Sequence, residues 1–395
     1  MAMHFIQRSV WGVGLLAASA CSGHEPDVGV ASQEVRGGQH APGCNKLKHG
    51  SFSLTTSLPA GAERTQATAT MLVDGRVLVV GGVNNGELPV LATAFIFDPS
   101  SATWNSTPDL AVPRVQHVAV RLQSGRVLVT GGADGALSTE LYDPGSNAWT
   151  TVGSLNLVRI ESEAVLALDG RVLVTGGIQS AIPSPSSAIE RFDPATGTWS
   201  IIGNLQVGRW RHTATLLPNG QVLVAGGASD SESALASAEL CDPVSGACAP
   251  TGSLVGPRSG HRAVRLNDGR VLIMGGDPPG GVGGPLNTAE IYDPVSGSFS
   301  AAASMSAVRD YLPAVAMPDG NVLVVGGYGS DFVAGAEIYL ASSDAWCLIG
   351  SLNIARFQHT ATLLGDGRVL VAAGSIRFPP DGVQMTGTAE VLNMP

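Results

Sequence analysis

One pattern recurs seven times along this 395-residue chain and constrains its fold more than any other feature. Each copy starts with an arginine, and successive arginines are 45 to 51 residues apart. The seven arginines are Arg64, Arg114, Arg159, Arg209, Arg258, Arg309 and Arg356. A period of this length is typical of architectures in which one supersecondary unit packs against its neighbours. The chain should therefore fold as a repeat array, although its length alone would suggest two or three domains.

Each copy carries the signals of four short strands. A strand of small and apolar residues, such as residues 212–217, leads to a two-residue turn whose second residue is glycine. Such turns favour hairpins because their central residues need positive φ. A continuous apolar run follows, such as residues 76–80, which is typical of a strand buried on both faces. A glycine pair ends that strand in six copies, and a third strand, an Asp-Pro turn and a fourth strand complete the unit.

The glycine pair, the Tyr-Asp-Pro turn and the tryptophan after it resemble the kelch motif, and the resemblance covers residues 51–395. It implies an all-β, seven-bladed kelch-type β-propeller in which each repeat forms one blade around a central channel. The last repeat stops after its third strand at residues 389–392, and residues 51–54 are similar to the fourth strand of another repeat at residues 298–301. We therefore predict that the N-terminal strand closes the last blade, which removes an exposed sheet edge.

The N-terminus has the features of an export signal over residues 1–20. Arg8 supplies a short positive region, and residues 10–20 are apolar but too short to span a bilayer. The segment that ends at Cys21 resembles the bacterial lipobox, so we expect Cys21 to carry a lipid anchor; the alternative is plain secretion with cleavage nearby. Residues 21–50 lack apolar periodicity and should form a flexible tether. We expect a protein that is lipid-anchored in a bacterial cell envelope or secreted, with no other membrane contact.

Four cysteines remain after Cys21, an even number for an oxidising compartment. Cys241 and Cys248 flank a five-residue turn and should face each other across a hairpin. Cys44 and Cys347 would then pair by elimination, near the predicted seam of the ring. The alternative is four free, buried thiols.

The charge pattern excludes several classes of partner and cofactor. The net charge is −10, and lysine occurs only at Lys46 and Lys48, so we expect no nucleic-acid partner. The glycine pairs lack the helix and the lysine of a phosphate loop. Four copies have a histidine three residues after the arginine, and ring symmetry should spread these residues apart, so we expect hydrogen-bonding roles and no metal site. They are His117, His212, His261 and His359. We expect no cofactor.

Candidate binding residues come from the start of each repeat. The seven arginines should form a ring at one end of the channel, where they bind either backbone carbonyls and acidic neighbours or an external anion. The next two positions vary between copies, which favours solvent-facing rim positions. Among them, aromatic side chains offer stacking surfaces and charged ones offer polar contacts; the alternative is idle surface variation. These rim candidates are Trp210, Tyr311, Phe357, Arg211, Glu161 and Asp310.

Two classes of function fit this sequence. The first is a surface-anchored, monomeric scaffold that binds a protein, peptide or glycan at a propeller face. The second is an enzyme that acts on a sugar at the channel mouth, because bacterial sialic-acid mutarotases and copper radical oxidases also use kelch propellers. The oxidases need two tyrosines, two histidines and a cysteine crosslinked to tyrosine, and no such set is recognisable here. No Gly-x-Ser-x-Gly elbow is present. We therefore assign no catalytic residue and favour the binding scaffold.

Overall fold

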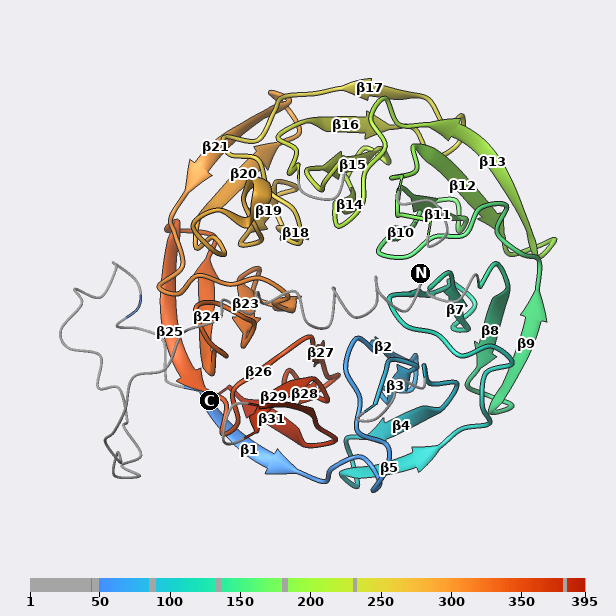
Figure 1. The fold of residues 1–395 in the computed structure, drawn as a ribbon, viewed down its shortest axis with the longest axis vertical. Helices are drawn as coiled ribbons and strands as arrows, with labels where there is room; N and C mark the ends of the chain where they lie inside the picture. Colours follow the sequence, from blue (N-terminus) through green and yellow to red (C-terminus); the bar gives the residue numbers. More distant parts are fainter. Residues whose placement is uncertain are drawn as a thin grey trace, which may run out of the picture.

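The strands of the protein form a closed ring of seven blades, each a four-stranded antiparallel sheet (Figure 1). The structure is a computed structural model that describes residue 44 and residues 50–84, 90–132, 136–179, 184–229, 233–378 and 382–394. The innermost strands of consecutive blades contact each other around the ring, and β2 contacts β27 where the ring closes. The predicted all-β, seven-bladed propeller is confirmed.

The strands lie in sequence order from the channel to the rim in blades 1 to 6. Blade 1 contains β2 (Thr68–Met71), β3 (Val77–Val80), β4 (Ala94–Asp98) and β5 (Thr103–Ser106), and blade 2 contains β6 (Val118–Arg121), β7 (Val127–Thr130), β8 (Thr139–Asp143) and β9 (Ala148–Val152). Blade 3 contains β10 (Glu163–Leu166), β11 (Val172–Thr175), β12 (Ala188–Asp193) and β13 (Thr198–Asn204), and blade 4 contains β14 (Thr213–Leu216), β15 (Val222–Ala225), β16 (Ala238–Cys241) and β17 (Cys248–Pro250). Blade 5 contains β18 (Arg262–Arg265), β19 (Val271–Met274), β20 (Ala289–Asp293) and β21 (Ser298–Ala302), and blade 6 contains β22 (Ala314–Ala316), β23 (Val322–Val325), β24 (Gly335–Leu340) and β25 (Ala345–Ser351).

Blade 7 joins the two ends of the chain. It contains β27 (Thr360–Leu363), β28 (Val369–Ala372), β31 (Ala389–Asn393) and, as its outer strand, β1 (Ser51–Thr55). β1 pairs antiparallel with β31, from Ser51 opposite Asn393 to Thr55 opposite Ala389. The prediction that the N-terminal strand closes the last blade is thus confirmed.

Two small elements lie outside the blades. A three-stranded sheet of β26 (Arg356–Phe357), β29 (Ser375–Phe378) and β30 (Gly382–Met385) precedes β31, and a short 3₁₀ turn, η2 (Pro279–Gly281), lies between β19 and β20. No helix in the described part of the chain is long and apolar enough to cross a membrane.

Both predicted disulfides are formed. Cys241 bonds to Cys248 across the β16–β17 hairpin, and Cys44 bonds to Cys347 on β25. The second bond ties the segment before β1 to the neighbouring blade, beside the seam where the ring closes. The predicted signal peptide at residues 1–20, the anchor at Cys21 and most of the tether lie outside the described residues and stay predictions.

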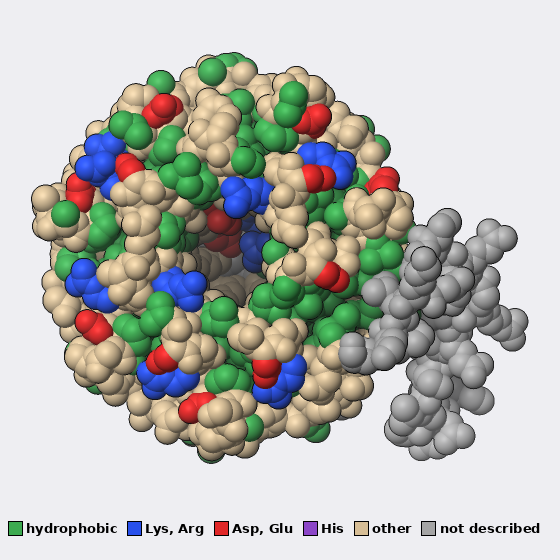
Figure 2. Space-filling model, turned by 180° about the vertical axis from the view of Figure 1, so that it is seen from behind, with side chains coloured by type: hydrophobic (Ala, Val, Ile, Leu, Met, Phe, Trp, Pro, Cys, Tyr) green, Lys and Arg blue, Asp and Glu red, His purple; other side chains and the backbone are tan. Residues whose placement is uncertain are grey.

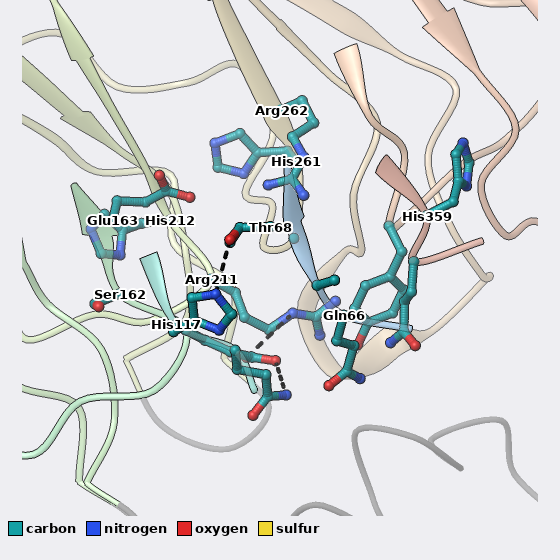
Figure 3. Close-up of a pocket in the computed structure, with 16 residues that line it drawn as sticks. Gln66, Thr68, His117, Ser162, Glu163, Arg211, His212, His261, Arg262 and His359 are labelled. Atoms are coloured by element: carbon teal, nitrogen blue, oxygen red, sulfur yellow. Dashed lines mark hydrogen bonds and ion pairs between the residues drawn. The ribbon is translucent and has the colours of Figure 1, made fainter. Parts of the chain in front are cut away.

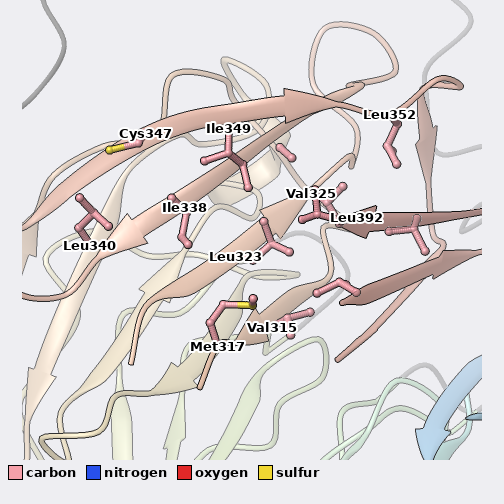
Figure 4. Packing of buried hydrophobic residues seen from close by; sticks show 13 residues of the cluster. Val315, Met317, Leu323, Val325, Ile338, Leu340, Cys347, Ile349, Leu352 and Leu392 are labelled. Atoms are coloured by element: carbon pink, nitrogen blue, oxygen red, sulfur yellow. The ribbon is translucent and has the colours of Figure 1, made fainter. Parts of the chain in front are cut away.

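The core lies between the blades because the second strand of each blade buries both faces. On β23, Leu323 and Val325 pack toward blade 7, in a cluster with Val369 and Val371 of β28 (Figure 4). Val322, the neighbour of Leu323, packs toward blade 5. Continuous apolar runs therefore serve two blade interfaces at once, as strands with two covered faces do. This packing fixes the positions of the inner strands, and hence of the channel wall.

Candidate functional site

The seven repeat arginines are interior residues, not a binding rim. All are at most 2% exposed. In each blade one Nη atom of the arginine donates to the carbonyl of the residue just after the second strand, which is the first glycine of the pair in six blades, at 2.7–3.1 Å. Six of the arginines also form buried ion pairs of 2.6–3.1 Å with a glutamate of the third strand. The pairs are Arg114–Glu140, Arg159–Glu190, Arg209–Glu239, Arg258–Glu290, Arg309–Glu337 and Arg356–Glu390; Arg64 instead lies over the ring of Phe95. These guanidinium groups are not accessible to an external anion, so of the two alternatives the anion-binding ring is wrong and binding to carbonyls and acidic neighbours is confirmed.

The glycine pairs complete this framework by joining neighbouring blades. The amide of the second glycine donates to the carbonyl of the next blade's arginine at 2.8–2.9 Å in all seven blades, from Gly82 to Arg114 and finally from Gly374 to Arg64. Close approach requires glycine, because a Cβ on Gly132 would lie 2.8 Å from the carbonyl oxygen of Val115, at a φ of +103°. The repeated arginine and glycines therefore hold the blades and the ring together.

The position after each arginine is also buried, which corrects a second expectation. Asp310 is 5% and Phe357 6% exposed, and Trp210 is partly buried. The backbone at this position pairs with the residue that follows the glycine pair, as in the bridge between Asp310 and Tyr328. Variation here reflects packing against the following loop, so these are not solvent-facing rim positions.

The second position after each arginine forms a ring, which we call the collar. Its seven members have φ between 45° and 65°, the left-handed region that residues other than glycine rarely adopt. The members are Gln66, Gln116, Glu161, Arg211, Gly260, Tyr311 and Gln358. Backbone hydrogen bonds link neighbours around the ring, from the amide of Gln66 to the carbonyl of Gln358 at 3.2 Å and from that of Gly260 to Arg211 at 2.8 Å. Such conformations persist only where the surroundings enforce them, and they cluster at functional sites.

A cavity of about 230 Å³ lies in the channel against the collar (Figure 3). Its wall is made by the collar and by the first residues of the inner strands: Ala67, Thr68, His117, Ser162, Glu163, His212, His261, Arg262 and His359. From the side opposite to the view of Figure 1, the centre of the ring is hollowed, with acidic and basic side chains visible inside (Figure 2). The structure thus brings Glu161, Arg211 and Tyr311 of the predicted candidates together around one cavity.

Arg211 reaches across the collar and connects four blades. Its Nη2 atom is 3.1 Å from a carboxylate oxygen of Asp277 and 3.8 Å from one of Asp310, and its Nε is 4.0 Å from Glu161. Its guanidinium lies 4.8 Å from the ring centroid of Tyr311, a cation–π distance. Gly260 makes this possible, because a Cβ there would lie 2.5 Å from Nη2 of Arg211.

Burial and crowding shift the acidic groups of this cluster. Desolvation, reinforced by the nearby Asp277, raises the pKa of Asp310 to about 8, although Arg211 opposes the shift. Desolvation likewise raises the pKa of Glu161. The pKa of Arg211 is lowered by desolvation but raised overall by the surrounding acidic groups. At neutral pH Arg211 therefore stays charged, and the carboxyl group of Asp310 is largely protonated.

Several buried polar atoms of the collar have no hydrogen-bond partner among the described residues. They are both amide atoms of Gln66, Oε1 of Gln116 and Oε2 of Glu161; Oδ1 of Asp310, next to the collar, also has no partner there. An unsatisfied buried polar group costs about 1–3 kcal/mol, so each such group calls for an explanation. Their concentration around one cavity is consistent with groups kept available for a ligand.

The repeat histidines support the channel wall. Nε2 of His117, His212 and His261 lies 2.9–3.0 Å from a threonine hydroxyl, each time of the blade before it. Burial lowers the pKa of His117, His212 and His359 to about 3 and keeps them neutral. No group of three or more His, Cys, Asp or Glu side chains in the described ranges is placed to hold a metal ion. The expected hydrogen-bonding role fits three of the four histidines.

Two cavity residues escaped sequence analysis, although a signal for them was present. Four residues after the repeat arginine, two copies carry opposite charges, Glu163 and Arg262, and five copies carry uncharged residues. Comparing the copies at this position as well would have identified both.

Comparisons with known proteins agree with the repeat pattern and the fold. The family model described as the kelch motif matches residues 66–111, 164–206 and 257–306. No curated protein sequence matches the chain. Among solved structures, a fungal alcohol oxidase of the AA5 family, in complex with copper, superimposes with a TM-score of 0.73 at 18% sequence identity, covering 88% of this chain and 77% of that one. At this identity the likeness concerns the fold alone.

The residues of this chain do not fit the copper centre of such oxidases. All four described cysteines are bound in disulfides, so none is available for a crosslink to tyrosine. The histidines around the channel bond to threonines or lie in separate blades, and no metal-binding cluster exists in the part of the chain that the structure describes. We derive no redox chemistry for this site.

Proposed function

Because the chain is a kelch-type β-propeller, we propose that it is an exported binding scaffold that takes a small polar group, such as one residue of a peptide or glycan, into its central channel. One observation carries this proposal. A cavity of about 230 Å³ is lined by seven collar positions that the fold makes equivalent and that five different residue types occupy. Structural positions repeat from blade to blade, as the repeat arginine does in all seven, whereas collar positions differ.

The chemistry of the collar favours a ligand recognised by many weak polar contacts. Three glutamines, one tyrosine and two charged residues supply donors and acceptors, and Gln66 holds both amide atoms without a partner. Arg211 is already surrounded by Asp277, Asp310 and Glu161, so it offers little net positive charge to an anion. A sialic-acid-like carboxylate is therefore a poor fit at the collar.

An enzyme acting on a sugar is the second candidate. Its candidate proton-transfer group is Asp310, whose pKa desolvation raises to about 8 beside Asp277; Asp310 contacts Arg211 of the cavity wall but does not itself line the cavity. Turnover of a sugar anomer that is lost in Asp310→Asn would support this function. Binding without turnover would support the scaffold.

Export and anchoring are supported by the two disulfides, which persist in oxidising compartments. We propose that Cys21 carries the lipid. A Cys21→Ser variant should then move from the membrane fraction to the soluble fraction of cell envelopes. Retention of this variant in the membrane fraction would contradict the anchor.

The binding proposal can be tested by isothermal titration with neutral monosaccharides, free L-amino acids and dipeptides. Gln66→Met removes two unpartnered polar atoms while keeping a similar shape, so it should leave stability unchanged or raise it. The same change should weaken binding, by about tenfold if one good hydrogen bond is lost. The control is Gln123→Met on an exposed turn of an inner strand. Equal binding by the two variants, or no binding of any compound, would refute a channel site.

A further inference from the structure

Two side chains of opposite charge face the cavity from separate blades. Glu163 is the first residue of β10 in blade 3, and Arg262 is the first residue of β18 in blade 5. Figure 3 shows them on different sides of the same cavity. The equivalent position in the other five blades is uncharged: Thr68, Val118, Thr213, Pro313 and Thr360. The repeat therefore does not need a charge here, and the two charges call for a separate explanation.

The two side chains do not neutralise each other. They form no ion pair within 4.0 Å, whereas other charged pairs of the channel do. Nε of Arg262 donates to the carbonyl of Leu312 at 3.0 Å, which orients the guanidinium and leaves its two Nη groups without a partner among the described residues. The carboxylate of Glu163 has no hydrogen-bond partner there either. Desolvation in the channel wall raises the pKa of Glu163 to about 7, against the pull of Arg262.

We propose that the channel binds a zwitterionic ligand, a free amino acid or a short peptide, with its ammonium on Glu163 and its carboxylate on the Nη groups of Arg262. This inference rests on the proposed function and names its ligand class. A guanidinium fork matches the geometry of a carboxylate, and charge-assisted hydrogen bonds are about twice as strong as neutral ones. The ligand would give each unpaired charge the partner that the protein does not supply.

Other ligand classes fit these two groups less well. A neutral sugar would offer no counter-charge to Glu163, which is partly buried, or to Arg262, which is exposed. A simple anion would satisfy Arg262 but would lie near Glu161 and Glu163. A simple cation would satisfy Glu163 but would lie near Arg262 and Arg211. Only a ligand with both charges matches both walls.

The size of the cavity agrees with this class. A volume of about 230 Å³ lies below the range of about 300–1,000 Å³ for drug-sized ligands, so the cavity suits a small ligand such as a single amino acid. A longer peptide would have to extend along the hollow seen in Figure 2.

The test uses the oxidised mature protein and isothermal titration with each of the common L-amino acids and with dialanine. For the best binder, two analogues each remove one charge: the methyl ester removes the carboxylate, and the N-acetyl form removes the ammonium. We expect each analogue to bind at least about tenfold more weakly than the parent, because each leaves a charged protein group unpaired.

Variants assign the two charges to the two walls. In Glu163→Gln, the N-acetyl analogue should bind as well as the free amino acid; in Arg262→Gln, the ester should bind as well as the free amino acid. The matched control is Arg265→Gln, on the same strand β18, which should keep the preferences of the unmodified protein. Thermal unfolding of each variant shows that it is folded. Unchanged analogue preferences in the two cavity variants would overturn the assignment.

The failure of this inference can be told apart from failure of the proposed function. Binding of neutral sugars, weakened by Gln66→Met, together with no binding of amino acids, would refute the zwitterion site and leave the channel scaffold in place. No binding of either class would refute both.

Discussion

The buried ion pair between Arg159 and Glu190 allows the framework of the ring to be tested quantitatively. The guanidinium donates to Oε1 of Glu190 through Nε at 3.1 Å and Nη2 at 3.0 Å, and to the carbonyls of Gly176 and Ala188. Glu190 also accepts hydrogen bonds from the backbone amides of Asn156 and Leu157 at 2.7 and 3.1 Å. One carboxylate thus pairs with a buried cation and also accepts hydrogen bonds from the backbone of the segment that connects two blades.

The substitution Glu190→Gln removes the negative charge with little change of shape. It leaves the charge of Arg159 buried without a counter-ion, and removing one partner of a buried pair costs about 3–5 kcal/mol. Folded domains are stable by only about 5–15 kcal/mol, so the loss would be a large part of the whole. An exposed pair provides the control: Asp169 lies 2.9 Å from Arg171, with both side chains about a third exposed. Asp169→Asn should cost at most about 1 kcal/mol.

The assay is equilibrium unfolding in urea with both disulfides intact, monitored by tryptophan fluorescence. We expect the unfolding midpoint of Glu190→Gln to fall far below that of Asp169→Asn, at an unchanged slope. A cost below about 1 kcal/mol for Glu190→Gln would refute the reasoning, because it would mean that the buried arginine does not depend on its glutamate.

Two further predictions concern the collar and the histidines. Gly260→Ala should destabilise the protein by about 1 kcal/mol more than Gly281→Ala in the same urea assay, because the φ values are +65° and +63° but only the first methyl meets Arg211; equal costs would contradict the role of Gly260. The pKa values of about 3 for His117, His212 and His359 lie below the unfolded value of about 6.5, so stability is fully present above pH 6.5 and is lost as the pH falls toward 3. His212→Asn should flatten the fall by up to about 1.4 kcal/mol per pH unit, measured by urea unfolding between pH 7 and pH 4, and an unchanged slope would contradict a neutral buried histidine.

The blades, their closure and the disulfides were predictable because each depends on short-range patterns and on one topological rule. The turn after each inner strand and the apolar run of the second strand are local signals, and an incomplete last repeat needs its fourth strand from elsewhere. The match of residues 51–54 to residues 298–301 identified that strand. The Cys44–Cys347 disulfide was predicted by elimination, and both cysteines lie near the seam that this strand closes.

Of the two alternatives for the arginines, binding to backbone carbonyls and acidic neighbours is confirmed, whereas a ring accessible to an external anion is wrong, because the burial of each arginine depends on a partner far along the chain. Glu190 lies 31 residues after Arg159, on the third strand of the same blade. From the sequence alone an arginine just before an inner strand is expected to be exposed, because burying its charge is tolerable only when a carboxylate pairs with it. A glutamate in the third strand of six copies was the available signal.

The collar could be located along the sequence but not in space. Its left-handed backbone was not predictable, because residues such as Gln116 and Tyr311 are not those that favour positive φ. Its convergence on the channel follows from ring closure, which brings equivalent residues of all blades to one axis. The variation at these positions predicted solvent-facing rim residues, and in the structure Glu161, Arg211 and Tyr311 line the wall of a cavity in the channel.

Sevenfold repetition separates the demands of folding from those of function. Positions that repeat, such as the glycine pairs and the arginines, are buried in interactions within and between blades, where an external ligand does not reach them. The departures from the repeat depend on each other: Arg211 of one repeat needs the missing side chain of Gly260 in the next and lies over Tyr311 of the third. This arrangement involves residues of several blades. The ring does not need it in order to close, since the other collar positions lack an equivalent arginine. The departures around the channel are therefore the positions at which we propose that this propeller binds its ligand.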